Sequence, residues 1–201
     1  MKEKIKFDTE KIKYYSWIFA AVVIIFFLTA FTELSMGRLF FGSDGKFGWW
    51  EGNIWSSEQS QRFADPYSFT HIIHGLLFYL IVWLSARKMP VRYRFLIAVI
   101  LEAGWEIMEN SPLIIDRYRA VTISLGYVGD SVINSLSDIL MMIIGFLLAA
   151  RWKVWMSVVL VILIELVLLL LMKDNLTLNI IMLIFPLEAI KSWQIAGHVI
   201  P

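Results

Sequence analysis

Ionisable side chains gather in three short motifs of a chain that is otherwise strongly apolar. The motifs read HIIHG at residues 71–75, EAGWEIMEN at residues 102–110 and GDSVINSLSD at residues 129–138. Each lies in or beside a stretch apolar enough for a bilayer, where an ionisable group is costly and therefore marks a candidate functional site. Imidazole and carboxylate groups together can bind a divalent cation or transfer protons.

The spacing within each motif places its polar residues on one side of a helix, because residues three, four or seven apart share a helix face. The residues related in this way are His71 with His74, Glu102 with Glu106 and Glu109, and Asp130 with Asn134 and Asp138. We therefore expect three helices that each direct one polar face toward a common site.

Two kinds of chemistry suit this set. Histidine nitrogens and carboxylate oxygens are ligands for zinc, manganese or iron(II), and such an ion could polarise a phosphoryl or acyl group. The candidate metal ligands are His71, His74, Glu106 and Asp130. A metal-free site, with a histidine as general base oriented by a carboxylate, is equally compatible. In either case the candidate catalytic residues are His71, His74, Glu106, Glu109, Asp130, Asn134 and Asp138.

Three further residues are candidates for substrate binding. Arg117 and Arg119 follow the second motif, and they either neutralise its carboxylates or bind a lipid phosphate at the membrane interface. Ser131 lies next to Asp130 and carries a hydroxyl group. The alternative for all of these residues is a buried polar network that only holds the helices together.

Composition assigns the chain to the polytopic membrane proteins. Of its 201 residues, 59% are hydrophobic and 17% are charged, and the mean hydropathy is +0.69. The net charge of +1, with Lys and Arg at segment ends and not in one patch, excludes a nucleic-acid-binding surface. Because the chain contains no cysteine, it has neither a disulfide framework nor a thiolate site.

The hydropathy pattern predicts an all-α bundle of five to six transmembrane helices in a single domain, residues 1–201, because a bilayer core needs ~20 apolar residues per helix. The first segment lacks a small-residue cleavage site, so we expect an uncleaved signal anchor. The last is short and contains Pro186, so it spans with a kink, lies in the interface or re-enters. The segments are residues 15–35, 67–86, 93–110, 129–150, 153–172 and 176–190.

The distribution of Lys and Arg predicts a cytoplasmic N-terminus, since short cytoplasmic loops carry the excess of these residues. Residues 37–66 then form an extracytoplasmic loop, and the three motifs meet near the outer leaflet. Twelve basic residues lie inside in this orientation, namely Lys2, Lys4, Lys6, Lys11, Lys13, Arg87, Lys88, Arg92, Arg94, Arg151, Lys153 and Lys191. Six lie outside, namely Arg38, Lys46, Arg62, Arg117, Arg119 and Lys173.

Three stretches of the sequence resemble a known family. They read SSEQSQRFADPYSFTHIIHGLLFY (56–79), WEIMENSPLIIDRYRAVTISLGYVGDSVINSLSD (105–138) and DNLTLNIIMLIFPLEAIKSWQ (174–194). They are similar to the uncharacterised protein family 0314, also called domain of unknown function 2585. This resemblance covers most of the chain from about residue 37 and implies a multi-pass protein of the bacterial cell membrane.

A shorter likeness is to the VanZ-like membrane proteins, which pair a Glu late in one helix with a D-x-x-x-N pattern at the start of the next. Here Glu106 or Glu109, followed by Asp130 and Asn134, would match that pattern. The likeness implies cell-envelope chemistry on the outer side of the inner membrane.

Two functions remain open at this point. The first is a membrane-embedded hydrolase or transferase, with or without a divalent metal, that acts on a lipid or lipid-linked envelope substrate. The second is a non-catalytic scaffold or small transporter in which the same residues form a polar network. An enzyme should show the imidazoles and at least two carboxylates converging beside a cavity, whereas a scaffold should show each carboxylate paired and no cavity. The sequence leaves the oligomeric state open.

Overall fold

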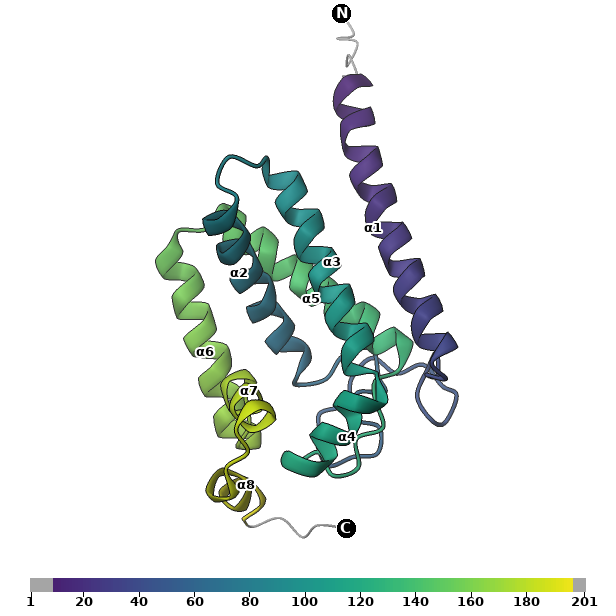
Figure 1. The fold of residues 1–201 in the computed structure, drawn as a ribbon, viewed down its shortest axis with the longest axis vertical. Coiled ribbons are helices and arrows are strands. Elements are labelled where there is room, and N and C mark those ends of the chain that lie inside the picture. The colour runs from purple at the N-terminus through teal and green to yellow at the C-terminus, as the bar shows by residue number, and fades with distance from the viewer. Residues whose placement is uncertain (1–8, 197–201) are drawn as a thin grey trace, which may run out of the picture.

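Helices form all of the regular secondary structure in the described part of the chain. The structure is a computed structural model that describes residues 9–196, and these residues form eight helices and no strand (Figure 1). The predicted all-α fold is confirmed. The predicted cytoplasmic residues Lys2, Lys4 and Lys6 lie outside the described residues. The helices are α1 (Thr9–Ser35), α2 (Ser68–Ser85), α3 (Val91–Glu109), α4 (Pro112–Val121), α5 (Val132–Arg151), α6 (Val154–Met172), α7 (Leu176–Ile184) and α8 (Glu188–Ile195).

Four helices are long and apolar enough to cross a membrane. They are α1 over Ser16–Ser35, and α2, α5 and α6 over their whole lengths. The third predicted segment, residues 93–110, forms α3, which has 19 residues but carries five Arg and Glu side chains. Three of these belong to the second motif, so α3 is less apolar largely because it carries part of the candidate site.

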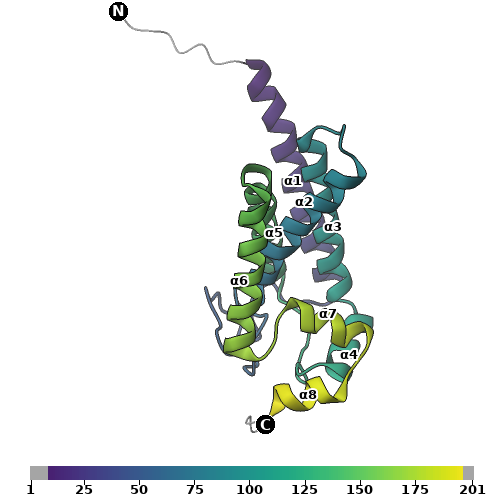
Figure 2. The ribbon, with the colours of Figure 1, turned by 90° about the vertical axis from the view of Figure 1, so that its left-hand side faces the viewer.

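The predicted sixth segment, residues 176–190, forms two short helices instead of one span. Pro186 lies between α7 and α8, and neither helix, at nine and eight residues, has the ~20 residues needed to cross a membrane. Both helices lie at the end of the molecule opposite the N-terminus (Figures 1 and 2). Lys191 Nζ donates to the carbonyl of Ala120 in α4 at 2.9 Å. This contact corrects the prediction that Lys191 lies on the same side as the N-terminus.

The connection between α3 and α5 contains a helix, α4, that the hydropathy pattern did not predict. Pro112 stands in its first turn, where the missing amide hydrogen of proline costs no helical hydrogen bond. α4 lies next to α7 at the end opposite the N-terminus (Figure 2). Tyr118 of α4 and Asn179 of α7 line a cavity at this end of the molecule.

Helices α2 and α5 pack backbone to backbone, and this contact fixes the position of both histidines. A Cβ atom on Gly75 would lie 2.0 Å from the Met142 carbonyl oxygen, and one on Gly145 would lie 2.1 Å from that of Ile72. Glycine allows such close approach between membrane helices. Because Gly75 directly follows His74, the contact holds the histidine-bearing turns of α2 against α5.

The segment between α1 and α2, residues 36–67, folds onto the first turn of α5. The first amide groups of a helix have no partner within it, and here carbonyl groups of the loop accept their hydrogen bonds. Val132 N donates to Leu39 O at 2.9 Å, and Ile133 N donates to Phe40 O at 3.2 Å. The loop therefore packs against a helix that carries part of the candidate site.

Candidate functional site

Three helices bring the predicted residues to one end of the molecule. α2 begins, α3 ends and α5 begins at the end opposite the N-terminus (Figure 1). Of the seven predicted catalytic residues, Glu106 is fully buried beside His71, with 3.3 Å between its Oε1 and the Nδ1 atom. The other six line a cavity of about 470 Å³, namely His71, His74, Glu109, Asp130, Asn134 and Asp138.

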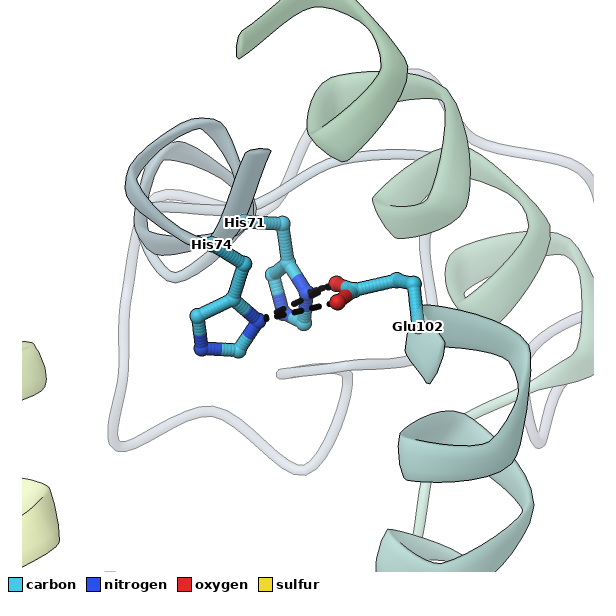
Figure 3. A group of neighbouring side chains, drawn as sticks. All are labelled: His71, His74 and Glu102. Atoms are coloured by element: carbon cyan, nitrogen blue, oxygen red, sulfur yellow. Dashed lines mark hydrogen bonds and ion pairs between the residues drawn. The ribbon is translucent and has the colours of Figure 1, made fainter. Parts of the chain in front are cut away.

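Glu102 of α3 joins the two histidines of α2 (Figure 3). Its Oε1 atom lies 2.5 Å from Nδ1 of His71 and 3.1 Å from Nδ1 of His74. A carboxylate only accepts hydrogen bonds, so both Nδ1 atoms carry the hydrogen in this arrangement. The two Nε2 atoms are then available as metal ligands or bases. In Figure 3 the second ring nitrogen of His74 points away from Glu102.

The carboxylates of Glu106 and Asp138 are buried without a full set of partners. Both oxygens of Glu106 and Oδ1 of Asp138 lack a hydrogen-bond partner among the described residues. The two residues are 0% and 4% exposed, and Oδ2 of Asp138 lies 3.7 Å from Nε2 of His71. Burying such oxygens is costly unless a cation or a proton satisfies them. These oxygens could therefore hold a cation between α2, α3 and α5, or the two carboxyl groups could be protonated.

Asp130 lies two residues before the first residue of α5, although the predicted helix included it. Asn110 Oδ1 accepts the backbone amide hydrogen of Asp130 at 2.7 Å, and the Tyr127 hydroxyl donates to Oδ1 of Asp130 at 2.9 Å. Burial raises the pKa of Asp130 to about 7, although the hydrogen bond from Tyr127 acts in the opposite direction. Near neutral pH this carboxyl group can therefore take up or release a proton.

Ser131 and Asn134 connect α5 to the loop between α1 and α2. Ser131 is the N-cap of α5, and its hydroxyl donates to Gln61 O at 3.1 Å while it accepts from Asn134 N at 3.4 Å. Asn134 Nδ2 donates to Arg62 O at 2.9 Å. Ser131 is not among the described residues that line the cavity, so its geometry supports capping and not the predicted binding of substrate.

Arg117 and Arg119 of α4 donate to backbone carbonyl groups. Nε and Nη2 of Arg117 lie 3.0 and 2.7 Å from Leu183 O near the end of α7, and Arg119 donates to Tyr127 O. Neither arginine is among the described residues that line the cavity. Both side chains therefore hold α4 in place, and the predicted contact with a substrate headgroup finds no support in their geometry.

Three overlapping sets of side chains could each hold a metal ion, with ligand atoms within 4.8 Å of one another. The four predicted ligands are divided among these sets, and no set contains more than two of them. Ligand atoms around an ion with bonds of ~2.0–2.2 Å lie more than ~3 Å apart, so the 2.5 Å between His71 and Glu102 is a direct hydrogen bond. Of the other two sets, only the one formed by His71, Glu106 and Asp138 contains a histidine, so it is the best candidate. The sets are His71, His74 and Glu102; His71, Glu106 and Asp138; and Glu106, Glu109 and Asp130.

The predicted catalytic set omits Glu102, although its spacing from Glu106 places both on the same face of α3. It also omits Asn110 and Tyr127, which hold Asp130. Asn110 ends the second motif and Tyr127 precedes Asp130 by three residues, but an amide and a phenol carry no distinctive sequence signal. Only the fold shows that α3 ends beside the segment that leads into α5.

Comparison with known proteins places the chain in a family. The family described as "Protein of unknown function (DUF2585)" matches residues 33–196. The chain belongs to the DUF2585 family. The predicted resemblance is thereby confirmed, and all three motifs lie within the part of the chain that matches DUF2585. The likeness to VanZ-like proteins stays a prediction.

Proteins similar to this DUF2585 chain span nearly its full length. A UPF0314 protein of Paracoccus denitrificans is 49% identical over 88% of this chain and 91% of its own length. UPF0314 proteins of Sphingopyxis alaskensis and Rhizobium etli are 47% and 45% identical, over 90% and 92% of this chain and 95% and 94% of their own lengths. No solved structure matches the chain.

Proposed function

We propose that this DUF2585 protein is a membrane-embedded, metal-dependent hydrolase or transferase. The observation that carries the proposal is the pair of buried carboxylates of Glu106 and Asp138, which both lie beside His71 and both have oxygens without a hydrogen-bond partner among the described residues. His71 and Asp138 also line the cavity. One imidazole and two carboxylates form a donor set that suits zinc, manganese or iron(II).

The proposed substrate is a lipid or a lipid-linked molecule of the bacterial cell envelope. The cavity lies at the end of the helices opposite the N-terminus, and the excess of basic residues favours a cytoplasmic N-terminus. Together these features favour a site at the extracytoplasmic face of the inner membrane. A substrate that reaches the cavity there can have its apolar part in the bilayer.

The residues of the site have three different roles in this proposal: metal binding, orientation of the imidazole rings and proton exchange. His71, Glu106 and Asp138 would hold the ion, which would polarise a phosphoryl or acyl oxygen of the substrate. Glu102 orients the imidazole rings of His71 and His74 through their Nδ1 atoms. Asp130 has a pKa of about 7 and lines the cavity, so it can exchange a proton with a substrate there.

The alternative is a non-catalytic scaffold or small transporter with a structural polar network. Such a network would pair each carboxylate with an arginine or a hydroxyl group, as Tyr127 pairs with Asp130. Glu106 has no such partner among the described residues. A cavity of about 470 Å³ beside the cluster also favours ligand binding over a packed network.

Elemental analysis of the full-length protein, purified in detergent after growth with zinc, manganese and iron, tests the proposal. We expect one or more equivalents of one of these metals in the parent protein. His71→Ala and Asp138→Ala should each lose it, because each removes a ligand. Asp174→Asn is the matched control, since Asp174 is a buried carboxylate between α6 and α7, outside the three sets.

The outcomes separate the two functions. Stoichiometric metal that is lost in the two site variants and kept in the control supports the enzyme. A parent protein without bound metal, or variants that retain it, overturns the metal-dependent proposal and leaves the scaffold or transporter.

A further inference from the structure

A groove runs along the membrane-crossing helices next to the cavity. It has a volume of about 790 Å³ and lies between residues 50–55, the beginning of α2 and the second half of α6. Among the described residues that line it, only Asn53 is neither apolar nor glycine. The volume falls within the ~300–1,000 Å³ of ordinary ligand pockets.

The groove opens toward the surroundings of the helix bundle. Leu163 and Leu171 line it from α6, and they are 55% and 78% exposed within the chain. α6 is apolar and long enough to cross a membrane, so the medium around it is hydrocarbon. The molecules that can fill such a groove are therefore the acyl chains of membrane lipids.

Hydrophobic contacts alone cannot make the groove select one lipid acyl chain over the surrounding bilayer. Lipid tails are as apolar as the groove, so moving a chain from the bilayer into it gives little hydrophobic free energy. Ile54 and Trp55 line both the groove and the polar cavity. A lipid whose chain lies in the groove therefore has its headgroup end next to the cavity, where polar contacts can hold it.

We propose that the groove holds an acyl chain of a membrane glycerophospholipid whose headgroup end enters the cavity. The chemistry at the headgroup rests on the proposed function, but the apolar contacts of the chain do not require a metal. Among the described residues, no Lys or Arg lines the cavity. The lipid phosphate would thus meet the proposed metal ion and not a guanidinium group.

Photocrosslinking tests where the chain lies. The full-length protein is placed in phosphatidylcholine nanodiscs that contain phosphatidylcholine with a diazirine in one acyl chain, and the adducts are mapped by mass spectrometry. We expect adducts to concentrate on the lining residues of α2 and α6. Leu163→Trp should fill the groove and reduce these adducts about tenfold, which corresponds to about 1.4 kcal/mol.

Ile162→Trp is the matched control. Ile162 is 52% exposed on α6, close to the 55% of Leu163, but it does not line the groove. It should leave the groove adducts unchanged, and equal melting temperatures of both variants and the parent would show that neither change unfolds the protein. Adducts spread evenly over α1 and α6, or unaffected by Leu163→Trp, overturn the proposal.

Repeating the experiment after metal removal by a chelator separates this inference from the proposed function. Groove adducts in a protein that never holds metal would support the lipid site and overturn the metal-dependent enzyme. Stoichiometric metal without groove adducts would overturn the lipid site alone.

Discussion

The two histidines of α2 have different surroundings. His71 is 6% exposed and faces Glu102 and Glu106 at Nδ1 and Asp138 at Nε2. His74 meets one carboxylate, Glu102, at Nδ1. A carboxylate that binds both rings sets both tautomers at once, so Glu102 controls which nitrogen each histidine can offer to a ligand.

Replacing Glu102 with glutamine should therefore disturb both histidines. In either orientation of the glutamine side chain, its NH₂ donor replaces an oxygen that lies 3.1 or 3.2 Å from Nδ1 of His74, so this Nδ1–H group faces a second donor. We expect the nitrogen-15 NMR signals to show that one histidine leaves the Nδ1-protonated tautomer. Metal affinity, measured by competition with a chelator, should fall about 10–100-fold. Glu165→Gln on α6 is the control, and unchanged tautomers in Glu102→Gln would contradict the assignment.

Asp174, which lies outside the candidate metal site, makes the stability of the protein depend on pH. Between α6 and α7, its carboxylate accepts hydrogen bonds from the Tyr67 hydroxyl at 2.7 Å and from Gln194 Nε2 at 2.9 Å. Burial raises its pKa from 3.8 to about 6. The folded state therefore favours the protonated acid, and the resulting stabilisation is complete below the unfolded-state pKa and is lost as the pH rises to about 6. A shift of this size corresponds to about 3 kcal/mol.

Asp174→Asn should reduce this pH dependence. The variant cannot ionise at this position, so its melting temperature in detergent should change less than that of the parent between about pH 4 and pH 6.5. The variant should be less stable overall, because an amide group offers one oxygen where the carboxylate offers two. Asp116→Asn serves as control, because the side chain of Asp116 is 74% exposed. Parallel melting curves for parent and Asp174→Asn would show that this carboxyl group does not titrate in that range.

At the scale of the elements, the close contact between α2 and α5 should be the least tolerant of added volume. A Cβ atom on Gly145 would lie 2.1 Å from a backbone oxygen, and backbone cannot move aside without separating the helices. We expect Gly145→Ala to lower the free energy of unfolding by about 1–3 kcal/mol and to weaken metal binding, because α2 carries both histidines. Thermal unfolding in detergent measures the first effect.

Gly104 provides the control for this prediction. It lies within α3, and a Cβ atom there would meet nothing within 4 Å. Gly104→Ala should be neutral or stabilising by up to about 1 kcal/mol, since alanine is the better helix former. Equal melting temperatures for Gly104→Ala and Gly145→Ala would contradict the close contact.

The sequence predicted the apolar helices well because each is one uninterrupted stretch. The predicted segment 67–86 became Ser68–Ser85, and the predicted segment 153–172 became Val154–Met172. The hydropathy pattern did not predict α4 or the division of residues 176–190 between α7 and α8. These short helices depend on contacts with residues that are distant in the sequence. Glu165 of α6, for example, accepts the amide hydrogens of Leu176 and Thr177 at the start of α7.

The residues of the candidate site could be predicted from the sequence, but their contacts could not. Spacing showed which residues share a helix face, and segment order showed that the three faces end on one side. The rotation of α3 against α2 could not be read from spacing, and this rotation decides that Glu102 binds both histidines. Backbone contacts at Gly75 and Gly145 set part of that geometry, and a sequence pattern does not reveal which atoms they meet.

At the scale of the whole molecule, polar structure is distributed unequally between the two ends. The connections α2–α3 and α5–α6 are short, whereas the opposite end holds residues 36–67, α4, α7 and α8 (Figure 1). If the N-terminus is cytoplasmic, all of the larger end faces the extracytoplasmic space. The proposed envelope substrate depends on this orientation, because an extracytoplasmic substrate could not reach a cavity on the cytoplasmic side.

The lack of cysteine in the chain makes the orientation directly measurable. Lys46 and Lys88 are both exposed. Lys46 belongs to the connection between α1 and α2 and Lys88 to the connection between α2 and α3, and these connections lie at opposite ends of α2 (Figure 1). Lys46→Cys and Lys88→Cys therefore form a matched pair without background labelling. In intact cells with a permeable outer membrane, a membrane-impermeant maleimide should label Lys46→Cys only, and detergent lysis should expose both. Labelling of Lys88→Cys alone would place the cavity on the cytoplasmic side. The geometry of the site does not depend on which compartment it faces, so the same histidine and carboxylate chemistry would remain possible. Its substrate would then have to be cytoplasmic.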